Sequence, residues 1–417
     1  MAEETQSSIT VGVPKETYPG ENRVAMSPAA LPSLIKKNVK VLIEPGAGEK
    51  AGFVDAAYTE KGAKIAASRK EVFAADVVLQ VRTYGANPEE GKADLELMRP
   101  DLLIAGLSEP LVHPQAIAEI AERKATLFAM ELIPRITRAQ SMDVLSSQAN
   151  IGGYKAVLLA AEALTKMFPM MTTAAGTIPP ARVFILGAGV AGLQAIATAK
   201  RLGAVVEAFD VRPEVKEQVM SLGGKFVEVE LDTAEASGTG GYAKEQSEEF
   251  LKKQREVLAK TIAASDVVIT TAQVPGKKAP VLVTEEMVKG MSPGSVIVDM
   301  AAGQGGNVEP SRPNEVVELN GVKIIGPTNL PATVASDASA MYAKNCATLL
   351  LHLLKDGGLN LNMEDEIIRE TLVAKDGEVT NARVREALGM PPAAAPEPAK
   401  PPAEAETGEP EPAQTTN

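Results

Sequence analysis

The stretch that decides the fold is Arg182-Val-Phe-Ile-Leu-Gly187-Ala-Gly189-Val-Ala-Gly192-Leu-Gln-Ala. An apolar strand runs directly into a Gly-x-Gly-x-x-Gly turn, and an Ala-rich helix follows. In such a turn the first glycine allows a tight bend, the second lets the backbone approach a pyrophosphate, and the third lets helix and strand pack closely. The helix that opens at Val190 and Ala191 would direct the positive end of its dipole at the phosphates.

An acidic residue downstream supports a dinucleotide site. The next apolar segment, 205–210, ends in Asp210, which is 18 residues after Gly192. A carboxylate there accepts hydrogen bonds from the adenosine ribose and repels a 2′-phosphate, which favours NAD over NADP. Arg212 follows closely and weakens that preference. The alternative is a structural glycine-rich turn with an incidental aspartate.

Short apolar segments alternate with helical ones on both sides of this motif. We expect strands at 9–13, 39–44, 76–81, 102–107 and 126–130, and then at 182–186, 205–210, 266–271, 295–300 and 322–325. The expected helices between them include 28–37 and 114–124. This alternation predicts parallel sheets covered by helices on both faces. A long helix, 146–167, and a loop with paired prolines, 172–180, separate the two halves.

The length of 417 residues favours two domains. We expect the final helix, 336–354, to pack back onto the first half, so that 1–145 and 330–388 form one discontinuous domain and 146–329 the other. The alternative is that this helix caps the second domain. The segment 389–417 is mostly Pro, Ala and Glu and is expected to be a disordered tail, because it cannot bury enough apolar surface to offset its ordering entropy.

Composition excludes several classes of protein. A net charge of -12 argues against binding nucleic acid. Apolar runs fall short of the roughly 20 residues that span a bilayer, so we expect a soluble, cytoplasmic protein. The single cysteine, Cys346, lies in an apolar helical stretch and is expected to be inert core. No Cys/His cluster has the spacing of metal ligands, so no metal site is expected.

Groups for general acid–base catalysis are also scarce. Of the two histidines, His113 stands at a helix start, where a structural or surface role is expected, and His352 lies in an apolar stretch, where a packed or hydrogen-bonded role is expected. Dehydrogenases that reduce a carbonyl need an acid beside the nicotinamide, often His. A strong cofactor motif without one suggests hydride transfer from cofactor to cofactor, which needs alignment and a dry site.

Several further segments together resemble one family. They are Val11-Gly-Val-Pro-Lys-Glu-Thr, Gly20-Glu-Asn-Arg-Val-Ala, Pro275-Gly-Lys-Lys-Ala-Pro-Val-Leu-Val and Asp299-Met-Ala-Ala-Gly-Gln-Gly-Gly-Asn. All are similar to alanine dehydrogenases and to the alpha subunits of proton-translocating NAD(P) transhydrogenases. The likeness covers nearly everything from residue 9 to about residue 387.

The segment 134–150 favours the transhydrogenases, because it is similar to their signature loop. The resemblance implies that Arg135, Gln140, Asp143 and Ser146 contact the nicotinamide end of NAD(H). Gln and Ser side chains suit a carboxamide, and Arg135 and Asp143 are expected to form a charged latch. The alternative is an N-cap network in which Asp143 or Ser146 opens the following helix.

The glycine-rich segment 232–249 resembles the same family's mobile loop, which folds over the nucleotide with the tyrosine that matches Tyr242. Glycines around an aromatic residue suit a hinged lid that excludes water. The alternative is a surface loop with an exposed tyrosine. In contrast, the alanine dehydrogenase substrate groups are partly lost: Ser108 and Gly303 stand where those enzymes carry His and Asp, Arg82 replaces their Lys, and Arg23 matches their substrate arginine.

The sequence therefore predicts two Rossmann-like, doubly wound parallel-sheet α/β domains with the NAD site in the cleft between them. The resemblance implies hydride transfer from NADH to NADP held by a partner subunit, coupled to proton translocation by membrane-embedded subunits. It also implies a homodimer, peripheral on the inner face of the cell membrane, with no acid–base catalyst. The rivals are a stand-alone NAD-dependent alanine dehydrogenase and a non-catalytic NAD-binding regulator. The expected cofactor-binding residues are Gly187, Gly189, Val190, Ala191, Gly192, Asp210, Val211, Arg212, Gly241, Tyr242 and Ala272.

Overall fold

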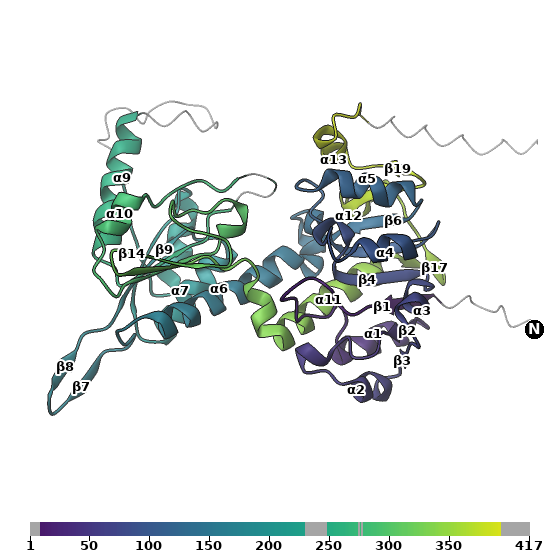
Figure 1. Ribbon diagram of the computed structural model, residues 1–417, viewed down its shortest axis with the longest axis horizontal. Helices are drawn as coiled ribbons and strands as arrows, with labels where there is room; N and C mark the ends of the chain where they lie inside the picture. Colours follow the sequence, from purple (N-terminus) through teal and green to yellow (C-terminus); the bar gives the residue numbers. More distant parts are fainter. Residues whose placement is uncertain (1–8, 230–247, 274–275, 277, 393–417) are drawn as a thin grey trace, which may run out of the picture.

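The computed structural model of the protein describes residues 9–229, 248–273, 276 and 278–392. They form two lobes, each built on a largely parallel sheet with helices packed against it (Figure 1). This confirms the expected pair of Rossmann-like α/β domains. The predictions for Gly241 and Tyr242, and for the tail from residue 393 onward, lie outside the described residues.

In the first lobe the sheet has the strand order β19-β18-β6-β5-β4-β1-β2-β3. The pairings from β3 through β6 are all parallel. The strands are β1 (Thr10–Val13), β2 (Lys40–Ile43), β3 (Lys64–Ile65), β4 (Val77–Arg82), β5 (Leu103–Leu107), β6 (Thr126–Ala129), β18 (Leu372–Lys375) and β19 (Glu378–Val379). The helices are α1 (Leu31–Ile35), α2 (Asp55–Glu60), α3 (Arg69–Phe73), α4 (Lys92–Leu97), α5 (Pro114–Glu122), α11 (Ala335–Leu353), α12 (Glu366–Thr371) and α13 (Ala382–Ala387).

In the second lobe the order is β11-β10-β9-β12-β13-β15-β14, again parallel except for the last pair. The strands are β9 (Arg182–Leu186), β10 (Val205–Phe209), β11 (Lys225–Phe226), β12 (Val267–Thr270), β13 (Val296–Asp299), β14 (Val316–Leu319) and β15 (Val322–Ile325). The helices are α6 (Val144–Ala163), α7 (Val190–Arg201), α8 (Lys216–Ser221), α9 (Glu248–Ala263) and α10 (Glu285–Lys289).

The sequence prediction missed three antiparallel hairpins at the edges. Two-residue turns connect β14 to β15, β18 to β19, and the short strands β16 (Leu354–Lys355) and β17 (Gly358–Leu359). The turn residues are Asn320-Gly321, Asp376-Gly377 and Asp356-Gly357, all with positive φ. Asn-Gly and Asp-Gly are the pairs that a tight hairpin turn of this hand favours, so the signal was present in the sequence.

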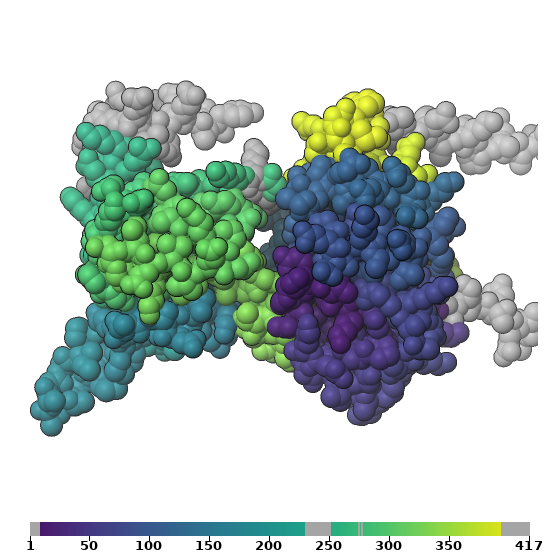
Figure 2. Space-filling view, in the orientation of Figure 1, coloured from purple at the N-terminus to yellow at the C-terminus, as the bar shows by residue number. Residues whose placement is uncertain are grey.

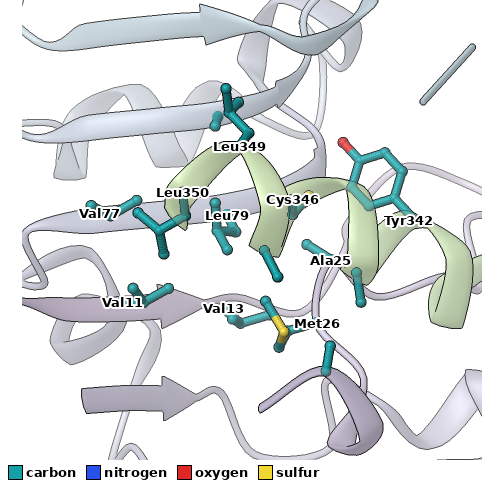
Figure 3. Packing of buried hydrophobic residues seen from close by; sticks show 14 of the residues in the cluster. Val11, Val13, Ala25, Met26, Val77, Leu79, Tyr342, Cys346, Leu349 and Leu350 are labelled. Carbon is teal, nitrogen blue, oxygen red and sulfur yellow. The ribbon is translucent and has the colours of Figure 1, made fainter. Parts of the chain in front are cut away.

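The helix α11 contributes to the core of the first lobe. Its residues Tyr342, Cys346 and Leu350 lie in one buried apolar cluster with β1 and β4, and Figure 3 shows them packed against Val11 and Leu79. Cys346 is fully buried, in agreement with the expected inert core position. The domain boundaries at 145/146 and 329/330 stay a prediction.

The expected loop at 172–180 is wrong in part. Residues Met171–Thr173 (β7) and Gly176–Ile178 (β8) pair as an antiparallel hairpin that projects from the second lobe (Figure 1). The paired prolines that suggested a loop lie just beyond β8. Every residue of both strands is exposed, including Met171 and Ile178.

Candidate functional site: the glycine loop and the segment beside it

The glycine loop lies at the carboxyl end of β9, next to β12. The chain runs from β9 outward to β10 and β11 and then returns to β12 on the other side of β9, so strand order reverses between β9 and β12. Ligands of open α/β sheets bind in the crevice at such a reversal. Figure 2 shows the molecular surface hollowed between the two lobes.

Two of the three glycines are required by the protein's own packing. Gly187 has φ +98°, which L side chains rarely adopt. A Cβ at Gly192 would lie 1.9 Å from the Gly187 carbonyl oxygen. These two residues therefore do what the motif predicts for bending and close packing.

Gly189 is different, because nothing in the described protein needs a glycine there. It is the N-cap of α7, with φ -75° and ψ -168°, a conformation open to other residues. An added Cβ would meet only Arg212 Nη2, at 4.0 Å. The space next to Gly189 is thus available for a ligand phosphate, and the residues present fit a dinucleotide.

Asp210 is held at the expected place but is not free. Its Oδ2 accepts hydrogen bonds from Ala188 N at 2.7 Å and Arg212 Nη2 at 3.0 Å, and its Oδ1 accepts from Arg212 N and Nε, both at 2.9 Å. Burial raises the pKa of this carboxyl, but the hydrogen bonds from Arg212 and Ala188 outweigh burial and lower it. Asp210 is therefore an anion whose charge Arg212 balances, while Val211 between them is 67% exposed.

Ala272, just after β12, is positioned by a residue that the sequence prediction missed. Asn307 accepts a hydrogen bond from Ala272 N at 3.0 Å and donates one to Ala272 O at 2.9 Å. Asn307 is in turn held through its backbone N by the buried carboxylate of Asp299. Within the motif that begins at Asp299, these two residues therefore order the loop beside the predicted cofactor site.

The predicted nicotinamide segment leads from the end of the 3-10 helix η5 (Thr137–Met142) into α6. Asp143 caps α6: it accepts from Ser146 N at 2.9 Å and from Ser146 Oγ at 2.5 Å. The alternative N-cap network is therefore present. Arg135 and Gln140 are exposed and make no side-chain hydrogen bond or ion pair within the described part of the chain. The expected latch between Arg135 and Asp143 is wrong, because Asp143 is engaged with Ser146 instead.

Helix α6 places this segment relative to the glycine loop. A Cβ at Gly153 would lie 2.1 Å from the carbonyl oxygen of Ala191, so α6 and the first turn of α7 are in direct backbone contact. Ser146 and Gly153 are seven residues apart and share a face of α6, separated by about 10 Å along its axis. The Gly152-Gly153 pair in an otherwise Ala- and Leu-rich helix was the overlooked signal for this contact.

The positions that match the alanine dehydrogenase substrate groups form a buried charge cluster in the first lobe. Arg23, 3% exposed, donates from Nε and Nη2 to the two carboxylate oxygens of Glu21, each at 2.7 Å. Burial raises the pKa of Glu21, but Arg23 overcomes this and lowers it to about 2. Arg82 also contacts Glu21, at 3.4 Å, and its guanidinium lies 4.2 Å from the ring centre of Tyr18. The substrate arginine of the rival hypothesis is thus already neutralised from within.

The remaining predicted groups stand apart from the glycine loop. Ser108 is buried and bonded to Thr83 at 2.9 Å, and Gly303 packs near Thr328. His113 is the N-cap residue of α5, and His352 Nε2 lies 2.9 Å from Asp365. Among the described residues there is no cluster of His, Cys, Asp and Glu that could hold a metal ion. None of the helices described has both the length and the apolar character to cross a bilayer.

Comparison with known proteins identifies the class of this two-lobed fold. The family model "Alanine dehydrogenase/PNT, N-terminal domain" matches residues 12–152, and "Alanine dehydrogenase/PNT, C-terminal domain" matches 156–382. The chain therefore belongs to the alanine dehydrogenase/PNT family. Within that family it is 49% identical over 377 residues to an NAD(P) transhydrogenase alpha subunit of Rhodospirillum rubrum, covering 89% of this chain and 98% of the relative.

Solved structures agree with this placement. A transhydrogenase from Sinorhizobium meliloti superposes with a TM-score of 0.80 at 44% identity, over 89% of this chain and 99% of that one. An L-alanine dehydrogenase superposes with a TM-score of 0.77 at 26% identity, over 91% and 99%. The fold is common to both kinds of enzyme, while sequence identity favours the transhydrogenase.

Proposed function

We propose that the chain is the NAD(H)-binding subunit of a proton-translocating NAD(P) transhydrogenase. The observation that carries the proposal is the space beside Gly189, which the protein's own packing leaves open at the N-terminus of α7. When bound, the nicotinamide ring supplies a hydride that passes directly to NADP+ on a partner subunit. The identity to transhydrogenase alpha subunits supports this role.

The second lobe would bind the adenosine half of NAD(H). Backbone amides at the start of α7 would face the pyrophosphate, where the helix dipole favours an anion. Asp210 would accept the ribose hydroxyls once Arg212 moves off it. The carboxylate would then repel a 2′-phosphate, which makes NAD(H) the preferred nucleotide.

The segment from Arg135 to Ser146 would position the nicotinamide half. Arg135 and Gln140 have side chains free for this role, and Ser146 retains lone pairs on Oγ for a carboxamide amide group. None of these residues exchanges a proton in the reaction. Their contribution is alignment, which can account for a large part of a hydride-transfer rate when water is excluded.

The partners follow from the same proposal. Membrane-embedded subunits would carry proton translocation and the NADP-binding domain would dock over the cleft, with this chain peripheral on the inner face of the cell membrane. We also propose a homodimer. The projecting hairpin β7–β8 supports it, because isolated two-stranded hairpins are marginal in water and this one exposes Met171 and Ile178.

The test is NADH oxidation by the purified chain under two conditions. With NADP+ and the NADP-binding domain of a related transhydrogenase, we expect hydride transfer. With pyruvate and ammonium alone, we expect none, because Arg23 is neutralised by Glu21. Turnover with pyruvate and ammonium would make the chain an alanine dehydrogenase, and NADH binding without transfer in either mixture would favour a regulator.

A further inference from the structure

A hydrogen-bond chain connects the buried Glu21–Arg23 ion pair to the segment predicted to hold nicotinamide. Arg23 Nη1 donates to Gln148 Oε1 at 2.9 Å, and Gln148 Nε2 lies 3.4 Å from Ser147 Oγ. Ser147 Oγ donates to Asn345 Oδ1 at 2.7 Å, and Asn345 Nδ2 donates to Ser141 O at 2.8 Å. The chain thus passes from the first lobe, through the first turns of α6, to α11 and back to η5.

Asn345 occupies a special place in this chain. It is 6% exposed and uses both ends of its amide, one on Ser141 and one on Ser147. These two contacts bracket Asp143 and Ser146, which lie between them in the sequence. The backbone from 141 to 147 is therefore fastened at both ends to a single side chain from a helix about 200 residues later.

The polar chain is held firmly at its other end as well. Gln148 is 7% exposed and also donates to Ala338 O of α11 at 3.1 Å, while Arg23 Nη2 lies 3.3 Å from Asn329 Oδ1. A buried network in which the members have partners rigidifies its surroundings, because each lost bond leaves a desolvated group. Such a network suits the positioning of reacting groups better than a contact with solvent would.

We propose that Asn345 is a positioning residue for the nicotinamide end of the dinucleotide site, supported through Ser147 and Gln148 by the Glu21–Arg23 pair. The arginine that matches a substrate ligand in the alanine dehydrogenases thereby serves as an anchor for the cofactor segment. The inference rests on the proposed function, since it assigns a task to the segment that carries Asp143 and Ser146. Asn345 itself touches no cofactor in this proposal and acts only through the backbone that it fastens.

The test compares Asn345→Ala in the full chain with Thr348→Ala as a matched control. Thr348 lies on the same helix and makes only a local bond to Lys344 O. Dissociation constants are measured for NADH and for AMP, which lacks the nicotinamide half, together with the melting temperature. Hydride transfer to NADP+ is measured with a transhydrogenase NADP-binding domain.

For Asn345→Ala we expect the AMP affinity to stay within twofold of wild type, while hydride transfer falls by roughly ten- to a hundredfold, the range for a displacement of about 1 Å. The ratio of NADH to AMP affinity should fall as well, and Thr348→Ala should change neither quantity. Equal NADH-to-AMP ratios in the two variants, or a parallel loss of AMP and NADH affinity, would overturn the proposal.

A second variant covers the case in which Asn345→Ala does not fold. Ser147→Ala removes one of the two fastenings and leaves the bond to Ser141, so a smaller loss in the same direction is expected. An unchanged NADH-to-AMP ratio in Ser147→Ala would count against the proposal. If wild type binds NADH but transfers no hydride with the partner domain, the proposed function fails on its own, while the affinity ratio still decides the role of Asn345.

Discussion

Replacing Gly189 with alanine separates the needs of the ligand from those of the fold. The backbone at Gly189 has φ -75°, and the new methyl group would meet only Arg212 Nη2 at 4.0 Å. Fewer unfolded conformations should stabilise the variant by about 0.4–1 kcal/mol. Loss of a good N-cap should cost about 0.5–1 kcal/mol. The two effects oppose each other, so we expect the free energy of unfolding to change by less than about 1 kcal/mol.

Dinucleotide binding should change far more than stability. The methyl group would enter the space where a pyrophosphate must approach the amides of α7. Overpacking of a closely fitted site costs about 1–3 kcal/mol, and tenfold in affinity corresponds to about 1.4 kcal/mol. We therefore expect NADH to bind roughly 5- to 150-fold more weakly to Gly189→Ala.

The assay is a titration with NADH, combined with thermal melting in the absence and presence of the nucleotide. The control is Gly192→Ala, whose Cβ would lie 1.9 Å from the Gly187 carbonyl oxygen and should lower the melting temperature without any ligand. Wild-type NADH affinity in Gly189→Ala would show that no phosphate approaches this backbone. A marked drop in its unliganded melting temperature would refute the reasoning from the open space.

Three further variants probe charge and assembly. Burial raises the pKa of Glu131 to about 7 from its ordinary value of 4.5, so the wild type should lose roughly 3 kcal/mol of stability as pH rises from 4.5 to 7. Glu131→Gln keeps the acceptor for Ser108 N and Glu109 N, and Oε2 of the native side chain has no hydrogen-bond partner among the described residues; its melting temperature should match wild type near pH 4.5 and exceed it at pH 8, and a pH-independent difference would contradict this. Asp210→Asn should weaken NADH binding about tenfold and raise the affinity for NADPH relative to NADH, because hydrogen bonds to a charged group contribute about 1.5–3 kcal/mol; titration with both nucleotides decides, and an unchanged ratio would argue against the role of Asp210. Replacing Met171 and Ile178 with serine should shift light-scattering mass from dimer to monomer at low protein concentration, whereas an unchanged mass would remove the hairpin from the dimer interface.

Local signals in the sequence were sufficient for most of the framework. The strands on both sides of the glycine motif fall within one or two residues of their predicted positions, because each is a short apolar run bounded by polar residues. The roles of Gly187 and Gly192 were also predictable, since a bend and a close strand–helix contact depend on the few residues of the motif itself.

Some misses were avoidable, because their signals were also local. The antiparallel hairpins turn at Asn320-Gly321, Asp356-Gly357 and Asp376-Gly377, pairs that favour two positive φ angles in succession. The pattern of alternating strands and helices led to an expectation of parallel pairing and hid these turns.

Other features depend on residues far apart in the sequence, and only the tertiary structure decided them. Whether Arg23 meets a ligand or Glu21, and whether Arg135 pairs with Asp143, depends on which partners folding brings within reach. The contact of Asn345 with Ser141 and Ser147 joins segments separated by about 200 residues. No period or turn signal encodes such a contact, because its geometry arises only when α6 and α11 pack together and exclude water from the polar groups between them.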